Sequence, residues 1–161
     1  MKTNLARLSL SGIAATALLA SVLAVAQTQA PPQGNHDPED CKGSTVDNQG
    51  AKVAKASRAF LAELQTAVGS GDRNKVASMI SYPFLVIQGI QRTKVKTRAE
   101  FLAQYDAIFD DHVRRAIAQQ SAKCLFGNYQ GTMIGTGEVW FSERPHGSMK
   151  IITVNSSAAA Q

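Results

Sequence analysis

The spacing of apolar residues changes at Ala122, and this change limits the chain to folds that keep helices and strands apart. From Ala51 onwards, apolar residues recur mainly every three or four positions, the spacing of a helix with one buried face. After Ala122 they form short β-prone runs separated by turns that contain glycine and proline. We therefore expect one α+β domain, in which helices pack on one face of a curved antiparallel sheet.

Four helices are expected before Ala122. The first covers residues 51–68 and is ended by glycines. Short polar residues, whose side chains accept from free N–H groups, mark where the others begin: Asp72, the capping box Thr97 to Glu100, and Asp110 or Asp111. The third helix carries one apolar stripe, formed by Phe101, Leu102, Tyr105, Ile108 and Phe109.

Strands are expected on both sides of the third and fourth helices. Tyr82-Pro83 stops the second helix, and a hairpin follows, in which residues 84–87 and 92–96 flank a turn at Gly89. The remaining expected strands cover residues 125–126, 131–134, 138–141 and 149–154.

The first 26 residues have the pattern of an export signal. Lys2 and Arg7 supply positive charge before an apolar run over residues 8–25. Residues 24–26 form a small-x-small cleavage site. Cleavage after Ala26 would leave 135 of the 161 residues in the periplasm or outside the cell. An uncleaved anchor is the alternative. No later run reaches the roughly 20 apolar residues that span a bilayer, so we expect no membrane contact after cleavage.

Two polar segments flank the expected domain of residues 51–155: a flexible arm over 27–50 and a disordered tail over 156–161. Cys41 and Cys124 are the only cysteines, and export favours a disulfide between them, with two unpaired thiols as the alternative. Neither a zinc-ligand spacing nor a nucleotide fingerprint is present, so we expect no metal and no cofactor. The net charge of +5 is scattered, so nucleic acid is not an expected partner.

Three stretches carry a family resemblance: Arg98–Phe109, Gly127–Phe141 and Lys150–Asn155, with Phe60-Leu61 and Gly71-Asp72 before them. Together with the element order, they resemble the nuclear transport factor 2-like superfamily, which includes the SnoaL-like cyclases, and in particular its small exported bacterial members. The resemblance covers residues 53–155. It implies a cone, in which a strongly bent sheet wraps around long helices and leaves a hollow. That hollow is an active site in some relatives, a binding site in others, and is filled with side chains in the rest.

Asp106 is the candidate for acid–base chemistry, because it borders the apolar stripe of the third helix and would lean into the hollow. It would act as a general base while Tyr105 or Tyr82 polarises a substrate oxygen; a structural hydrogen bond or simple solvation is the alternative. His112 follows two aspartates that act as caps, so no metal or acid–base role is expected for it. The expected pocket-lining side chains, for which core packing is the alternative, are Tyr82, Tyr105, Phe109, Met133 and Trp140.

We favour a non-enzymatic exported domain that binds a small ligand or an envelope protein, through the mouth of the cone or an exposed face of the sheet. Superfamily members often pair through their sheets, so a homodimer is one expected arrangement. A cofactor-free lyase or isomerase with Asp106 as its base is the first alternative. An accessory protein or inhibitor of an envelope enzyme is the second, because one fold hosts many functions.

Overall fold

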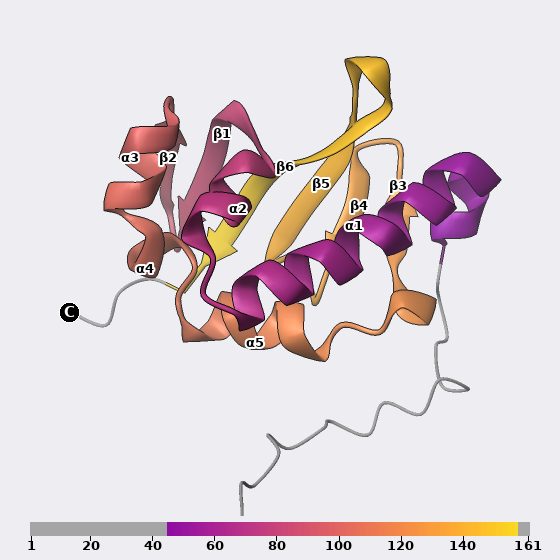
Figure 1. The fold of residues 1–161 in the computed structure, drawn as a ribbon, viewed down its shortest axis with the longest axis horizontal. Helices are drawn as coiled ribbons and strands as arrows, with labels where there is room; N and C mark the ends of the chain where they lie inside the picture. Colours follow the sequence, from indigo (N-terminus) through magenta and orange to yellow (C-terminus); the bar gives the residue numbers. More distant parts are fainter. Residues whose placement is uncertain (1–44, 158–161) are drawn as a thin grey trace, which may run out of the picture. The chain divides into compact units, whose positions relative to one another are not determined.

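Six strands form one sheet in the order β2-β1-β6-β5-β4-β3 (Figure 1). The computed structural model describes residues 45–157, which lie in the second of the two units into which the chain divides, Pro32–Gln161. The strands are β1 Ile80–Gln88, β2 Gln91–Val95, β3 Phe126–Asn128, β4 Gly131–Ile134, β5 Val139–Arg144 and β6 Ser148–Ser156. β1 and β6 pair in parallel, and the other neighbouring pairs are antiparallel.

The expected α+β class is confirmed, with a curved and open sheet whose edge strands are β2 and β3. The prediction of a wholly antiparallel sheet is wrong for the β1–β6 pair. These two strands are far apart along the chain, and the direction in which distant strands pair leaves no local signal in a sequence.

Helices precede and follow the β1–β2 hairpin. They are α1 Ala51–Gly69, α2 Arg73–Ser78, α3 Arg98–Ala103, α4 Tyr105–Ile108 and α5 Asp111–Gln119, with short 3-10 turns η2 Val46–Gln49, η3 Ala122–Cys124 and η4 Pro145–Gly147. The expected caps are confirmed at Asp72, Thr97 and Asp110, whose side chains accept from N–H groups at 2.8, 3.1 and 2.9 Å. The Glu100 carboxylate reaches back to accept from the Lys96 N–H at 2.7 Å, one residue before the N-cap N–H that a regular capping box uses.

Two element boundaries differ from the prediction. The expected third helix is broken at Gln104, whose φ of −115° is not helical, so α3 and α4 are separate. The break leaves the rings of Phe101, Tyr105 and Phe109 in mutual contact, with centroids 5.4 to 5.7 Å apart. The first strand begins at Ile80 and runs through Pro83, at a shift in its register with β6 where a proline is tolerated.

The folded domain begins before Ala51, which corrects part of the arm prediction. Val46 is fully buried, and the Gln49 side chain donates to the carbonyl oxygens of Asn128 and Gly131 at 2.6 and 3.2 Å. One apolar residue and one amide therefore hold η2 on the β3–β4 end of the sheet. This stretch is mostly polar, so its composition gave no indication of the contact.

The tail prediction is also too long at its start. Ser156 closes β6 and is only 6% exposed, and Ser157 donates to the Asp110 carboxylate. The export signal, residues 27–44 of the arm and residues 158–161 lie outside the described residues. Cys41 is among them, so its disulfide with Cys124 stays a prediction.

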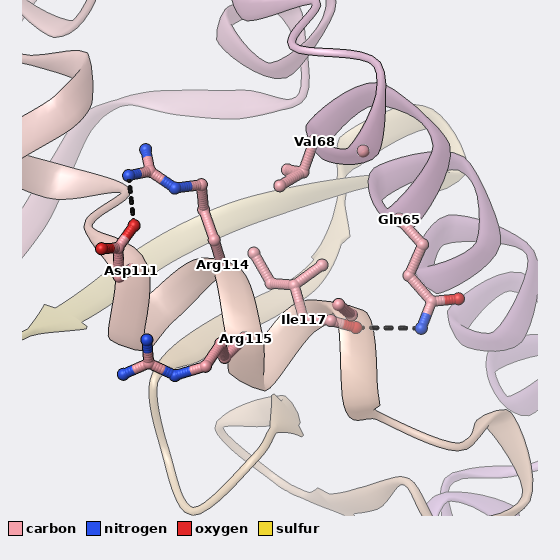
Figure 2. A pocket seen from close by; sticks show the side chains of 8 residues that line it. Gln65, Val68, Asp111, Arg114, Arg115 and Ile117 are labelled. Atoms are coloured by element: carbon pink, nitrogen blue, oxygen red, sulfur yellow. Dashed lines mark hydrogen bonds and ion pairs between the residues drawn. The ribbon is translucent and has the colours of Figure 1, made fainter. Parts of the chain in front are cut away.

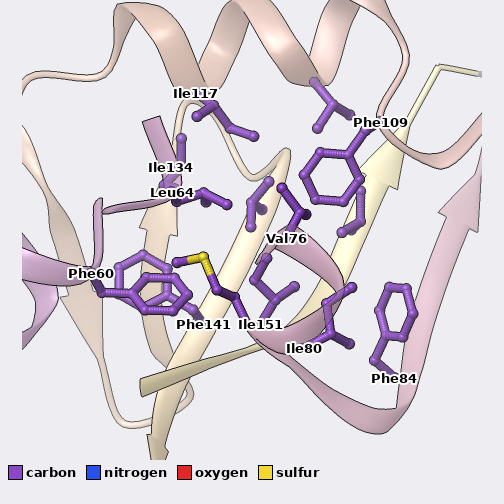
Figure 3. Packing of buried hydrophobic residues seen from close by; sticks show 14 of the residues in the cluster. Phe60, Leu64, Val76, Ile80, Phe84, Phe109, Ile117, Ile134, Phe141 and Ile151 are labelled. Atoms are coloured by element: carbon purple, nitrogen blue, oxygen red, sulfur yellow. The ribbon is translucent and has the colours of Figure 1, made fainter. Parts of the chain in front are cut away.

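One face of the sheet and all five α-helices enclose the apolar core (Figures 1 and 3). Val86, Val154, Val139 and Ile134 pair in register across four strands, and all point to this inner face. Phe60 of α1 stacks on Phe141 of β5 with ring centroids 4.6 Å apart. Within residues 45–157, no helix has the length and apolar character that crossing a bilayer requires.

Candidate functional site

Asp106 lies on the surface of α4, and the prediction that it leans into a hollow is wrong. Its side chain is 62% exposed and lies 3.0 Å from an Arg73 guanidinium nitrogen and 3.6 Å from one of Arg114. The stripe residues of α4, Tyr105 and Ile108, are buried in the core, whereas Asp106 lies on the exposed side of the helix. Asp106 therefore links α2, α4 and α5 through ion pairs, and no substrate-sized cavity described in the structure borders it.

The aromatic residues expected beside Asp106 belong to the core. Tyr105 and Phe109 are buried and stacked, and the Arg73 guanidinium carbon lies 4.8 Å from the centre of the Tyr105 ring. Burial raises the pKa of Tyr105, although Arg114 and Arg73 oppose the rise. The Tyr82 hydroxyl donates to the Ala77 carbonyl at 3.2 Å, and burial raises its pKa to about 12 against the influence of Arg98. The proposed acid–base set is therefore not assembled.

Met133 and Trp140 lie on the other face of the sheet, which we call the outer face. A row of directly paired residues crosses five strands of this face: Phe126, Met133, Trp140, Thr153 and Leu85. Directly paired residues point to the same side of a sheet, so these side chains form one continuous band. Phe126 and Trp140 meet edge to face with centroids 6.5 Å apart.

The band is wider at its centre because of an irregularity in β6. The β5–β6 register shifts between Trp140 and Phe141, so Ile152 and Thr153 together oppose one β5 residue. Ile87 adds a further apolar side chain on β1, and basic Arg92 and Lys94 flank the band on the edge strand β2. The apolar members are half-buried, whereas the inner-face residues of the same strands are buried. Within residues 45–157, the helices that fill the core all pack against the opposite face.

A separate pocket of about 330 Å³ lies where the start of α5, the β4–β5 turn and the end of β6 meet. We call it the His112 pocket, and its lining residues are His112, Thr136, Gly137, Glu138, Asn155, Ser156 and Ser157. The Glu138 carboxylate is buried and accepts from the Thr136 N–H, the Thr136 hydroxyl and His112 Nε2 at 2.6, 3.0 and 3.0 Å.

Glu138 remains charged in this pocket. Burial alone would raise the pKa of Glu138, but hydrogen bonds from its own N–H and from Thr136, together with the nearby His112, outweigh burial and lower it. Neither Glu138 nor Ser156 was a candidate from the sequence, and His112 was set aside. The sequence carries one signal for Glu138: the turn Gly135-Thr136-Gly137 comes directly before this acidic residue. Glycines permit a backbone that folds closely around a neighbouring side chain.

Two further depressions each contain an ion pair and one further basic side chain, Arg115 in the first and Lys150 in the second. One of about 320 Å³ lies between α1 and α5, where Arg114 is paired with Asp111 at 2.8 Å and Gln65 donates to the Ile117 carbonyl (Figure 2). The other, of about 380 Å³, contains the Lys75–Glu63 ion pair. Both depressions lie beside α1. Neither is lined by a residue that the sequence marked as a candidate for ligand binding.

Residues 45–157 hold no group of three or more His, Cys, Asp or Glu side chains arranged to bind a metal ion. Comparisons with known proteins add no assignment: no family model, no curated protein and no solved structure matches the chain.

Proposed function

We propose that the domain is an exported binding module that pairs with a second copy of the chain through the outer face of its sheet. The observation that carries this proposal is the apolar band that crosses five strands, from Phe126 on β3 to Leu85 on β1. Monomeric proteins rarely leave a continuous apolar surface of more than a few hundred Å² in contact with water.

The arrangement of the band favours association with a like surface. A two-fold axis parallel to the strands would lay β2 of one copy over β3 of the other, because it reverses the order of the strands. Arg92 and Lys94 of one copy would then face Phe126 and Asn128 of the other copy. They would not face Arg92 and Lys94 of the other copy, so like charges would not meet. The apolar centre around Trp140 would be buried in the middle of the interface, where binding energy concentrates.

The family proposal is compatible with this arrangement. An open curved sheet crossed on one face by α1 supports the cone architecture of the nuclear transport factor 2-like superfamily. In this chain Phe84, Phe101 and Phe109 are buried where a cone would be hollow. We therefore favour binding at the outer face over binding of a small ligand between helices and sheet. An envelope protein as the occupant of the same face is the second candidate.

The test compares two lysine substitutions in the chain that begins at Gln27. Met133→Lys places a charge in the band beside Trp140, whereas Tyr129→Lys adds the same charge at a side chain that is 95% exposed in the β3–β4 turn. Light scattering after size exclusion should give a dimer for the native chain and the Tyr129 variant, and a monomer for Met133→Lys. A native chain that is monomeric at every concentration contradicts self-pairing. Equal retention of envelope proteins by both variants contradicts the second candidate.

A further inference from the structure

We propose that the His112 pocket is a binding site for a small molecule with a primary ammonium group. Its walls come from three distant parts of the chain: the first turn of α5, the β4–β5 turn and the last residues of β6. At about 330 Å³ it lies at the small end of the range for ligand pockets.

The β4–β5 turn is shaped around the Glu138 carboxylate. Gly135 has φ of +67°, and a Cβ atom at this position would lie 2.1 Å from Glu138 Oε2. Only glycine therefore leaves room for the carboxylate beside this backbone. A buried carboxylate is costly unless it is compensated, and within the described residues the groups that compensate this one are Thr136 and the His112 ring.

Attaching the turn to α5 does not require Glu138. The Gln120 side chain, one residue past the end of α5, already accepts from the Gly135 N–H at 2.7 Å and so links the same turn to the far end of this helix. The contact between Glu138 and His112 is a second link, at the first turn of α5. Its negative charge also lines the pocket, where it can attract a cationic ligand.

Ser156 supplies an independent observation that favours a polar ligand in the pocket. Its residue is only 6% exposed, it lines the pocket, and its hydroxyl has no hydrogen-bond partner within residues 45–157. A buried hydroxyl without a partner costs about 1–3 kcal/mol, so nearly all such groups are satisfied in native proteins. A polar group of a bound ligand would satisfy this one.

The groups left over in the pocket are mainly acceptors. The donors of Ser157, its N–H and its hydroxyl, are both committed to Asp110 Oδ2, at 2.9 and 2.7 Å, and the Asn155 amide N–H group donates to the Gly137 carbonyl. The acceptors that remain are Oδ1 of Asn155 and the Ser156 oxygen, and Nδ1 of His112 joins them when the ring is neutral with its Nε2–H directed to Glu138.

A set of acceptors next to a buried negative charge selects a cationic donor. An ammonium group has three N–H donors and no acceptor, and it would compensate the charge of Glu138. An anion would be repelled by Glu138 and by Asp110, because hydrogen bonds from Val113, Ser157 and His112 outweigh burial and lower the pKa of Asp110. A neutral alcohol could donate to Ser156 but would bring no positive charge to Glu138.

The experiment uses three probes of similar size: n-butylammonium, n-butanol and butyrate. The histidine ring signals of the chain from Gln27 are followed by NMR, and the His112 signal is identified from a His112→Gln variant. Butylammonium should shift the His112 signal saturably in the millimolar range or tighter, and butanol and butyrate should bind at least roughly tenfold more weakly.

Matched variants separate a binding role from a structural one. Glu138→Gln should weaken butylammonium binding roughly tenfold or more, while Glu143→Gln, which changes an exposed glutamate of β5, should leave it unchanged. Ser156→Ala removes a hydroxyl with no partner, so it should weaken binding while leaving the fold intact even where Glu138→Gln unfolds the domain. No saturable shift with butylammonium, equal binding of butanol, or unchanged binding in Ser156→Ala would each overturn the proposal.

Discussion

Phe141 and Trp140 are neighbours on β5 that point to opposite faces, so replacing each by alanine distinguishes the two faces. Phe141 is fully buried and stacks on Phe60 with centroids 4.6 Å apart. Removing a ring from such a core costs about 3–5 kcal/mol, a large part of the ~5–15 kcal/mol that holds a domain together. Trp140 is half-buried on the outer face, so its removal should cost the isolated domain only about 1–2 kcal/mol.

The free energy of unfolding is measured by urea titration at low protein concentration, where self-pairing does not contribute. Far-UV circular dichroism is the signal, because Trp140 is the only tryptophan and its fluorescence is lost in the variant. Phe141→Ala should lose roughly twice as much stability as Trp140→Ala, or more. Equal losses would refute the reasoning, since they would mean that Trp140 is covered within one chain as completely as Phe141.

Three further substitutions test the local structure. Gly135→Ala should lower stability by about 1–3 kcal/mol, because its φ is +67° and a Cβ would meet Glu138, whereas Gly69→Ala, with open space around its Cβ, should not; urea midpoints compare the two. Thr97→Ala should cost about 1 kcal/mol through loss of the α3 cap, and Thr97→Ser should restore it in the same titration. The pKa values of Asp110 and Glu138 are lower in the folded state. The stabilisation by these carboxylates is therefore present above their unfolded pKa values near ~4 and is lost as the pH falls through the folded values. The free energy of unfolding, measured against pH, should fall on acidification, and it should fall less steeply in Asp110→Asn.

Local signals predicted most of the elements. Asp72, Thr97 and Asp110 cap helices where expected, because a cap depends only on a side chain and the N–H two or three residues later. Tertiary effects account for the errors. The stripe from Phe101 to Phe109 has a helical period, yet packing of these rings against one another accompanies a break at Gln104 that spacing alone does not reveal.

The candidate site was less predictable than the fold. Asp106 borders the apolar stripe in the sequence, but in the structure its side chain is exposed on α4 and paired with Arg73. His112, Glu138 and Ser156 come together only in the folded domain, since they belong to α5, the β4–β5 turn and β6. In the sequence, a local role accounts for each residue separately. His112 follows the aspartates at a helix start, Glu138 follows a glycine-containing turn, and Ser156 begins the polar tail. Met133 and Trp140 were predicted to line a pocket; they lie on the outer face of the sheet and line none of the described pockets, because the sequence could not decide which face they occupy.

Burial of the outer face between two copies is the central claim, and the emission of Trp140 during dilution tests it most directly. Sedimentation velocity and fluorescence are recorded on the same samples of the chain from Gln27, with Trp140 as the only tryptophan. The claim predicts a dimer that dissociates on dilution, with a shift of the emission to longer wavelength as the indole enters water. A monomer with constant emission at every concentration would contradict it.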